Sequence, residues 1–263
     1  MDHFADERDL ALLEGDRYTF SVLHRVIGGA CRLLLTDHTR LIVCHTAQPY
    51  PVWIWTPDDA SEAEYERAYR IAAEHSLLNG EYSFNLKYAA ADHFIRRAAA
   101  EGRALSVRMR MFAYDCREAI PPTVTADGGV AGCEGTDSEE LADLIGAFQD
   151  ETGVDKTDRD TRRRDAEAFI RGGRLFFWEN GEGKRVACCK YGTDGGMAYV
   201  NFVYTYPDFR RRHYAENLVY RITCRLLDEG YIPTLYADAD CAASNACYRK
   251  IGYVCRGGLC TIG

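Results

Sequence analysis

The sequence predicts a mixed α/β (α+β) protein with two domains. Segments with a helical repeat of apolar residues alternate with short apolar runs of strand length along the chain. Of the 263 residues, 47% are hydrophobic, with 17 Tyr and 11 Phe, so a sizeable core can form. A Pro- and Gly-rich stretch near the middle marks a boundary. We therefore expect an N-terminal α+β domain at residues 1–126 and a second domain at residues 127–263.

In the first half, helices are expected at residues 6–13, 19–27, 61–77 and 89–100, and strands at residues 31–35, 41–45, 52–56 and 104–114. Gly28-Gly29 ends the second helix, and the polar residues 36–40 separate two apolar runs as in a hairpin. Ser61 and Glu64 form a capping box at the start of the third helix. The last strand alternates apolar and polar residues, which is typical of a half-buried strand.

In this half of the sequence, no residues are spaced as in a catalytic motif. Trp53 and Trp55 share one face of a strand, where they either line a ligand pocket or, as we prefer, pack in the core. The order of elements echoes that of the second half. The first half is therefore either a separate α+β domain or a degenerate copy of the second.

The boundary is predicted at residues 120–129, which contain Pro121-Pro122 and Gly128-Gly129. Beyond it, strands are expected at residues 130–134, 175–178, 186–191, 198–206, 234–239, 253–255 and 259–262. Helices are expected at residues 138–148, 161–170, 213–229 and 242–251. Glycines end three of these helices, at Gly172-Gly173, Gly230 and Gly252.

Charge and cysteine usage exclude several classes of protein. The formal net charge of −8 argues against nucleic-acid binding and favours a cationic small substrate. The polar start is unlike a signal peptide and no apolar run approaches the length of a membrane span, so we expect a cytoplasmic protein without a membrane partner. The 11 Cys form no C-x-x-C pair and the His residues lack metal spacing, which predicts reduced, mostly buried thiols and no metal.

Residues 200–215, VNFVYTYPDFRRRHYA, carry the sharpest chemical signal. An apolar strand is followed by a turn at Pro207-Asp208, three arginines and an amphipathic helix. The start of a helix presents unpaired N–H groups and a positive dipole end, and Arg210, Arg211 and Arg212 add charged donors there. An arginine run alone is more often a solvated face, but its place between strand and helix favours a phosphate site.

Two segments then resemble a known family. RRRHYA at residues 210–215 looks like the Arg/Gln-x-x-Gly-x-Gly/Ala pyrophosphate loop of the GNAT superfamily of acetyl-CoA-dependent N-acetyltransferases. LYAD at residues 235–238, followed by SNACYRKIGY at residues 244–253, looks like the late strand and Asn-x-x-Tyr-x-x-x-Gly-Phe/Tyr helix of that family. The resemblance implies a GNAT-like mixed sheet flanked by helices in the C-terminal half.

The resemblance also implies acetyl-CoA as cosubstrate and a role for each matching residue. Backbone groups of Val203, Tyr204 and Thr205 would pair with the pantetheine arm. Asn245 would hydrogen-bond the cofactor near its thioester, and Tyr248 would be the general acid that protonates the leaving thiolate. The pyrophosphate would be held by the loop and helix start, namely Arg210, Arg211, Arg212, His213, Tyr214, Ala215 and Glu216.

The sequence departs from the family pattern at two places. His213 stands where the family has Gly, so its imidazole must swing away, donate to phosphate when protonated, or weaken cofactor affinity. Residues 198–205 contain no Asp or Glu, so the base that some members keep on this strand is absent. Glu179, Asp238 and Asp240 are candidate bases acting through water, although each is more often a turn or surface acid.

These observations favour transfer of an acetyl group from acetyl-CoA to a primary amine of a small acceptor by direct attack. The alternative is a catalytically weak or inactive acyl-CoA-binding module with a regulatory or scaffold role, which His213 and the missing carboxylate favour and Tyr248 and Asn245 oppose. Nucleic-acid binding through the three arginines conflicts with the negative net charge of the chain. We expect the first half to shape the acceptor site or a homodimer contact.

Overall fold

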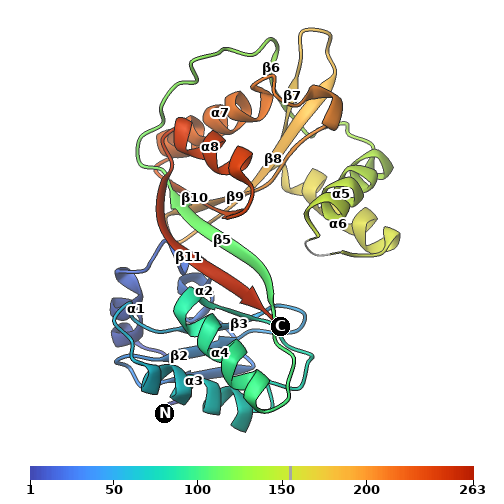
Figure 1. Ribbon diagram of the computed structural model, residues 1–263. Helices are drawn as coiled ribbons and strands as arrows, with labels where there is room; N and C mark the ends of the chain where they lie inside the picture. The colour runs from blue at the N-terminus through green and yellow to red at the C-terminus, as the bar shows by residue number, and fades with distance from the viewer. Residues whose placement is uncertain (154–155) are drawn as a thin grey trace. The chain divides into compact units, whose positions relative to one another are not determined.

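The computed structural model describes residues 1–153 and 156–263 (Figure 1). The chain forms two compact units. Unit 1 comprises residues 1–115, 236–245 and 254–263, and unit 2 comprises residues 116–235 and 246–253. Within the described residues, no helix is both long enough and apolar enough to cross a bilayer.

Unit 1 contains a sheet in the strand order β1-β2-β3-β4-β11-β5. Strands β1, β2 and β3 are antiparallel neighbours, β3 and β4 run parallel, and β11 is antiparallel to both β4 and β5. Its elements are α1 (Glu7–Glu14), α2 (Ser21–Val26), β1 (Leu33–Thr36), β2 (Ile42–His45), β3 (Val52–Trp55), α3 (Glu62–Glu74), β4 (Phe84–Lys87), α4 (Tyr88–Ala100), β5 (Val107–Asp115) and β11 (Val254–Ile262).

Unit 2 contains strands in the order β6-β7-β8-β9-β10, antiparallel except for the parallel pair β9–β10. Strand β10 and helix α8 each contribute residues to both units. The elements are β6 (Gly129–Gly132), α5 (Ser138–Thr152), α6 (Arg159–Gly172), β7 (Leu175–Glu179), β8 (Arg185–Asp194), β9 (Met197–Thr205), the 3₁₀ turn η1 (Pro207–Phe209), α7 (Tyr214–Asp228), β10 (Ile232–Asp238) and α8 (Ala242–Lys250).

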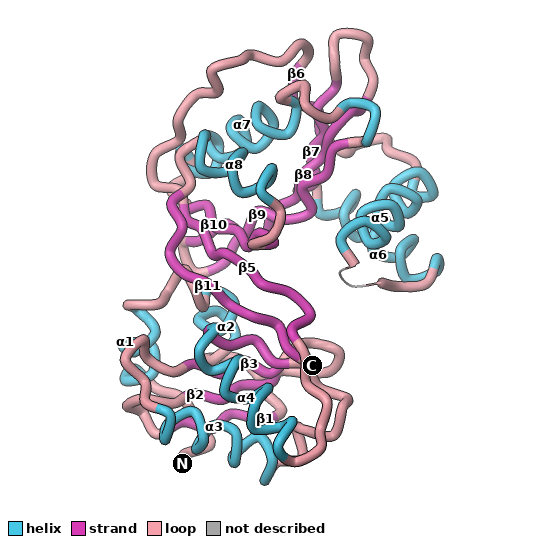
Figure 2. Tube along the Cα trace, viewed as in Figure 1, coloured by secondary structure: helices cyan, strands magenta, loops and turns pink. Residues whose placement is uncertain are grey.

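The two halves of the chain share one succession of elements (Figure 2). Two helices precede three antiparallel strands, then come a helix, a strand parallel to the third, another helix and a final strand. An antiparallel partner also precedes each pair of helices, as strand β6 against β7 and as a single bridge between Asp2 and Thr36. The topological echo in the sequence is therefore present in the strand pairing.

Local sequence signals explain most of the helix limits. Asp6, Asp137 and Asp158 accept hydrogen bonds from backbone N–H groups in the first turns of α1, α5 and α6. The capping box of Ser61 and Glu64 is present at the start of α3, as predicted. Apart from the two short strands expected at the C-terminus, the expected helices and strands are found, with ends that shift by a few residues.

The structure corrects the expectations at the C-terminus. Strand β11 is one strand, where the sequence predicted two short ones on either side of Gly257-Gly258. These glycines allow close contacts rather than a break, because a Cβ would lie 2.6 Å from Thr19 on Gly257 and 2.7 Å from Tyr88 on Gly258. Strand β11 also belongs to unit 1, so the compact units do not divide at residue 126. Strand β4 was not predicted at all.

Each unit has its own apolar core. In unit 1, one cluster joins α3 and α4 to the sheet around Phe84 and Phe94, and a second contains Trp53 and Trp55 at 6% and 3% exposure. The preferred core role of the tryptophans is thus confirmed. In unit 2, Leu141, Leu144 and Ile145 of α5 pack with strands β7 to β9.

Candidate active site

Strand β9 has an edge that is open over much of its length. Its parallel register with β10 runs from Met197↔Ile232 to Tyr199↔Thr234 and ends there. On the other side β9 stays paired with β8 as far as Thr205. Within the described residues, the β10 side of β9 beyond Tyr199 has no further register pair. This edge leaves backbone groups available to an extended ligand.

A bulge distorts β9 in the middle of this open stretch. The register with β8 shifts between Cys188 and Lys190, and Phe202 opposite has a φ of 52°. A positive φ is uncommon for an aromatic residue. The Phe202 ring packs 4.8 Å from that of Phe148, which holds the residue in place. Bulges of this kind redirect backbone groups and often lie beside active sites.

The predicted residues Val203, Tyr204 and Thr205 form the end of β9. Tyr204 is 7% exposed and its ring packs on the core of unit 2, while Val203 and Thr205 are half-buried. The Thr205 carbonyl already accepts a hydrogen bond from Arg210 Nε at 3.1 Å.

The segment between η1 and α7 forms a loop with unpaired donors. Arg211 and His213 both adopt left-handed backbone conformations at a φ of 62°. The first backbone bond that closes α7 runs from the Asn217 N–H to the His213 carbonyl. In the described part of the chain, the N–H groups of residues 211–216 have no hydrogen-bond acceptor. Successive free N–H groups at a helix start make an anion-binding concavity.

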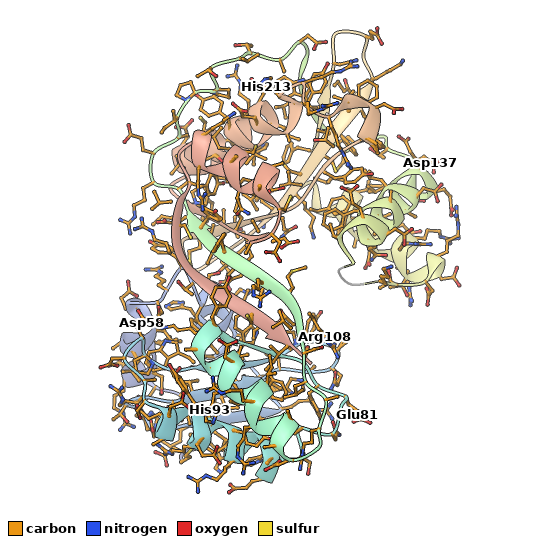
Figure 3. All side chains as sticks on the ribbon, in the orientation of Figure 1. Asp58, Glu81, His93, Arg108, Asp137 and His213 are labelled. Carbon is orange, nitrogen blue, oxygen red and sulfur yellow. The ribbon has the colours of Figure 1, made fainter. Side chains whose placement is uncertain are left out.

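His213 lies at the N-terminal end of α7 (Figure 3). Its Nδ1 atom is 3.2 Å from the Glu216 carboxylate, and the side chain is 35% exposed. The backbone of His213 adopts the conformation that a glycine would favour. Of the three outcomes left open by the sequence, this geometry corresponds to an imidazole that has swung aside.

The three arginines differ in their surroundings. Arg210 is held by a 2.5 Å ion pair with Glu151 of α5, in addition to its bond to Thr205. The Arg212 guanidinium lies 5.6 Å from the centre of the Phe209 ring, and Arg211 is exposed. Arg210 therefore ties the loop to α5, and the other two present charge at the surface of unit 2.

The predicted linker supports the first turns of α7. Asp127 accepts hydrogen bonds from the Tyr214 hydroxyl and the Gly181 N–H, both at 2.7 Å. The Gly181 and Tyr214 bonds lower the pKa of Asp127, and the carboxylate raises the pKa of Tyr214. The Asn217 side chain donates to the Val124 carbonyl at 2.9 Å. Sequence spacing does not reveal this role of Asp127, because its partners lie far along the chain.

Asn245 uses its side chain within the fold. Its Oδ1 accepts a hydrogen bond from the Tyr114 hydroxyl at 2.8 Å. Its Nδ2 donates to the carbonyls of Asp238 and Cys241 at 2.8 and 2.9 Å. Asn245 is 4% exposed, and its hydrogen bonds stabilise the turn between β10 and α8.

Tyr248 is also buried, at 7% exposure. Its ring centre lies 5.9 Å from that of Tyr253, in an edge-to-face arrangement. Tyr253 is anchored by a 2.9 Å hydrogen bond between its hydroxyl and that of Thr223. Helix α8 thus contributes Tyr248 to a buried aromatic pair.

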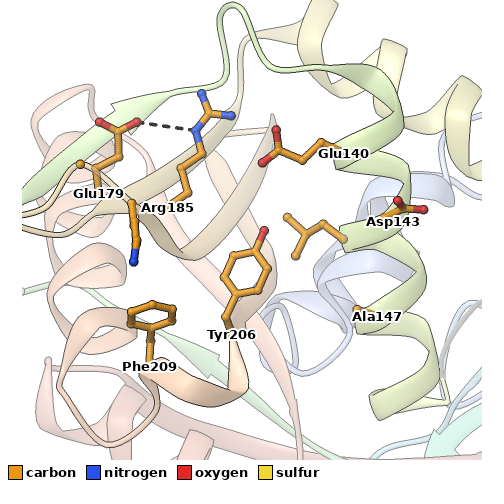
Figure 4. A pocket seen from close by; sticks show the side chains of 10 residues that line it. Glu140, Asp143, Ala147, Glu179, Arg185, Tyr206 and Phe209 are labelled. Carbon is orange, nitrogen blue, oxygen red and sulfur yellow. Dashed lines mark ion pairs between the residues drawn. The ribbon is translucent and has the colours of Figure 1, made fainter.

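A pocket of 670 Å³ includes Phe209, the residue just before the three arginines at residues 210–212 (Figure 4). Glu140 of α5 and the Tyr206 phenol project into it, and Glu179 lies 3.6 Å from Arg185 at its far wall. Burial raises the pKa of Tyr206 to about 12, so its hydroxyl remains a donor at neutral pH. The lining residues are Glu140, Asp143, Leu144, Ala147, Glu179, Gly183, Lys184, Arg185, Tyr206 and Phe209.

One polar cluster in unit 1 was missed by sequence spacing. Asp6, Asp9 and His38 bring ligand-type atoms within 4.8 Å of one another. The His38 ring nitrogens already contact Asp9 and Asp2 at 2.8 and 2.9 Å. The cluster is thus a closed hydrogen-bond network that connects the start of the chain to the β1–β2 turn.

The other two candidate bases, Asp238 and Asp240, lie at the end of β10 and in the turn after it. The Asp240 backbone N–H donates a hydrogen bond of 2.9 Å to the Asp238 carboxylate.

Comparison with known proteins places this site in a family context. Residues 141–253 match the model of a family described as "Acetyltransferase (GNAT) family". This segment contains β9, the loop of free N–H groups, Asn245 and Tyr248. A comparison with curated protein sequences finds no match.

Solved structures share the fold over nearly the whole chain. An acetyltransferase of the GNAT family from Colwellia psychrerythraea aligns with a TM-score of 0.54 at 11% identity, covering 99% of this chain and 98% of its own. A GCN5-related N-acetyltransferase from Kribbella flavida aligns with a TM-score of 0.57 at 16% identity, covering 97% and 93%. A GCN5-related N-acetyltransferase-like protein from Streptococcus suis gives 0.54 at 12%, covering 97% of each chain. At these identities the likeness concerns the fold, and it spans both halves.

Proposed function

We propose that this protein, whose residues 141–253 form an acetyltransferase domain of the GNAT family, transfers an acetyl group from acetyl-CoA to a primary amine. The observation that carries the proposal is the row of N–H groups at residues 211–216, which have no acceptor among the described residues. A buried or half-buried donor without a partner is unfavourable unless water or a ligand satisfies it. A pyrophosphate supplies several acceptors and the matching charge.

The open edge of β9 supports a path for the rest of the cofactor. The pantetheine arm carries amide groups that can pair with a strand edge, and the unpaired stretch beyond Tyr199 provides one. With the pyrophosphate at the start of α7, the thioester would lie near the bulge at Phe202. A backbone N–H redirected by the bulge would then stabilise negative charge on the thioester oxygen.

In the proposed reaction the neutral amine attacks the thioester carbonyl. A C–N bond forms and the C–S bond breaks, and the thiolate takes a proton from the Tyr248 hydroxyl. The attacking nitrogen gives up one proton as the amide forms, and through water this proton restores the Tyr248 hydroxyl. The ammonium of the acceptor must first lose a proton to a base or to water. We expect the acceptor to be a small amine. Asn245, whose side chain is hydrogen-bonded to Tyr114 and to backbone carbonyls, would act by stabilising the β10–α8 turn.

The position of the 670 Å³ pocket disfavours Glu179 as the base. The pocket contains Tyr206, four residues beyond Phe202, which is about 13 Å along an extended chain. It therefore borders the phosphate end of the proposed path rather than the thioester end.

The second candidate is an acyl-CoA-binding module with little or no turnover. Its supporting observation is the burial of Tyr248 against Tyr253, which limits the reach of the phenol. Under this alternative the loop and β9 would bind the cofactor for a regulatory or scaffold role. Homodimer formation and cytoplasmic location stay predictions under either reading.

Calorimetric titration with acetyl-CoA tests the binding step. We expect micromolar affinity, weakened at least about tenfold in the double variant Arg210→Ala/Arg212→Ala, because charge-assisted contacts to phosphate are lost. Glu151→Gln is the matched control, since it breaks the ion pair of Arg210 but keeps the guanidinium. Equal loss in the control would mean that loop anchoring, not phosphate contact, explains the effect, and no binding to the wild type would refute the proposal.

A turnover screen over small primary amines then separates the two candidates. Tyr248→Phe should lower kcat while acetyl-CoA affinity stays within about twofold, because one hydroxyl is removed from a packed aromatic pair. Binding without turnover by the wild type on any amine would favour the binding module.

A further inference from the structure

A second pocket lies in unit 1, at the place that corresponds in topology to the proposed cofactor site. The parallel strands β3 and β4 are paired only at Val52↔Phe84 and Trp53↔Asn85, as β9 and β10 are paired only over a short stretch. A pocket of 250 Å³ opens beyond these pairs. It is lined by Asp16, Thr19, Pro57, Asp58, Tyr65, Lys87, Ala89, Arg256, Gly257 and Gly258.

This pocket is unsuited to a second coenzyme A. The N-terminus of α3 is closed by the capping box of Ser61 and Glu64. The N–H groups of Glu64 and Tyr65 both donate to the Ser61 carbonyl. Asp58 stands in the loop before α3, where unit 2 has arginines before α7. Negative charge and satisfied donors both oppose phosphate at this end.

The pocket instead brings both signs of charge together. Lys87 Nζ is 2.6 Å from Asp16 and 2.5 Å from Asp58. Asp16 also accepts a 2.8 Å hydrogen bond from the Trp55 indole, so it is fixed on two sides. Asp58 is 88% exposed, so its pairing with Lys87 is the easier one to exchange. Arg256 adds a second cation, held in place by Asp115.

We propose that this pocket binds the zwitterion of a small α-amino acid, with its carboxylate at Lys87 and Arg256 and its ammonium at Asp16 and Asp58. The volume corresponds to about eight waters of the liquid, which suits a molecule of amino-acid size and excludes a nucleotide. The backbone at Gly257 and Gly258 lies close to the pocket without side chains to fill it. All residues that line the pocket belong to unit 1, and none of them is among the residues assigned to the proposed acetyl transfer.

Thermal unfolding and calorimetry of the full chain, with each of the standard L-α-amino acids in turn, test the proposal. At least one should raise the unfolding midpoint and bind, while its decarboxylated amine and its deaminated acid should each bind at least about tenfold more weakly, because each lacks one of two charge-assisted contacts. If no amino acid binds, or if either single-charge analogue binds as tightly, the proposal is wrong.

Two exposed positions supply matched variants. Asp58→Asn should weaken amino-acid binding about three- to tenfold through loss of one charge contact. Asp59→Asn makes the same change at the neighbouring residue, which pairs with Arg40 instead, and should leave binding unchanged. Lys87→Met should abolish binding, and the cooperative thermal unfolding transition of the same variants reports whether they fold. Equal binding by the Asp58 and Asp59 variants would overturn the assignment.

Discussion

Ala215 offers a direct test of the free N–H groups at the start of α7. It is the second residue of the helix and is half-buried, within the loop of unpaired donors. Ala215→Glu would place a carboxylate about 6 Å from a bound phosphate, where the repulsion between two unit charges is roughly 0.7 kcal/mol in water and about 3 kcal/mol at an effective dielectric of 20. Acetyl-CoA binding should therefore weaken between about threefold and a hundredfold.

Folding should respond in the opposite direction. A carboxylate in the first turn interacts favourably with the helix dipole, by about 0.3–1 kcal/mol. The thermal midpoint of Ala215→Glu should thus equal or slightly exceed that of the wild type. Ala215→Gln is the matched control, with the same size and no charge, and should bind acetyl-CoA within about twofold of the wild type because it adds no repulsion. Calorimetry on the three proteins gives the result, and equal affinity of the Glu and Gln variants would refute the phosphate assignment.

Three further predictions follow from individual side chains. Burial by itself would raise the pKa of Asp37, but hydrogen bonds from three backbone N–H groups outweigh this effect, so the pKa lies well below its usual range. Its stabilising contribution is therefore fully present above the unfolded-state pKa of 3.8 and is lost gradually as the pH falls from there toward the lower folded-state pKa, so Asp37→Asn should be less stable than the wild type at pH 7 and the difference should be smaller at pH 3 in urea unfolding. Cys255 is exposed, four cysteines are partly buried and six are buried, so a thiol reagent should show a fastest phase that Cys255→Ser removes, slower phases from the partly buried thiols, and reaction of the six buried ones only in denaturant. Asn245→Ala should lower the free energy of unfolding by about 2–4 kcal/mol in urea titration, because it leaves buried partners such as the Tyr114 hydroxyl unsatisfied.

The sequence predicted the fold best where local signals agreed. The arginine turn between β9 and α7 combined an apolar strand, a proline and an amphipathic helix, and the structure has each of them in place. Strand β4 was missed because Phe84–Lys87 is only four residues long and leads directly into α4. The continuity of β11 was missed because Gly257-Gly258 reads as a break, whereas their partners Thr19 and Tyr88 lie far along the chain.

The chemistry of the candidate site was predictable only in part. The residues that form the loop could be named from the pattern, but the left-handed conformations of Arg211 and His213 could not. The ion pair from Arg210 to Glu151 and the bonds of Asp127 depend on contacts across the fold. The same holds for Asn245, because its match to a family position does not predict the four internal hydrogen bonds of its side-chain amide. Sequence pattern identifies such residues, and tertiary packing decides which of their atoms remain free.

The two halves of the chain show how a shared topology leads to different chemistry. In each half a strand, a loop and a helix stand beside a parallel strand that pairs over a short stretch only. In unit 2 the loop ends in His213, which makes no side-chain cap, so the N–H groups at the start of α7 stay available. In unit 1 Ser61 and Glu64 close the start of α3, and Asp58 precedes them. In these proposals, a helix cap of two residues would separate the phosphate site in unit 2 from the zwitterion site in unit 1, although the strand pairing around both is alike.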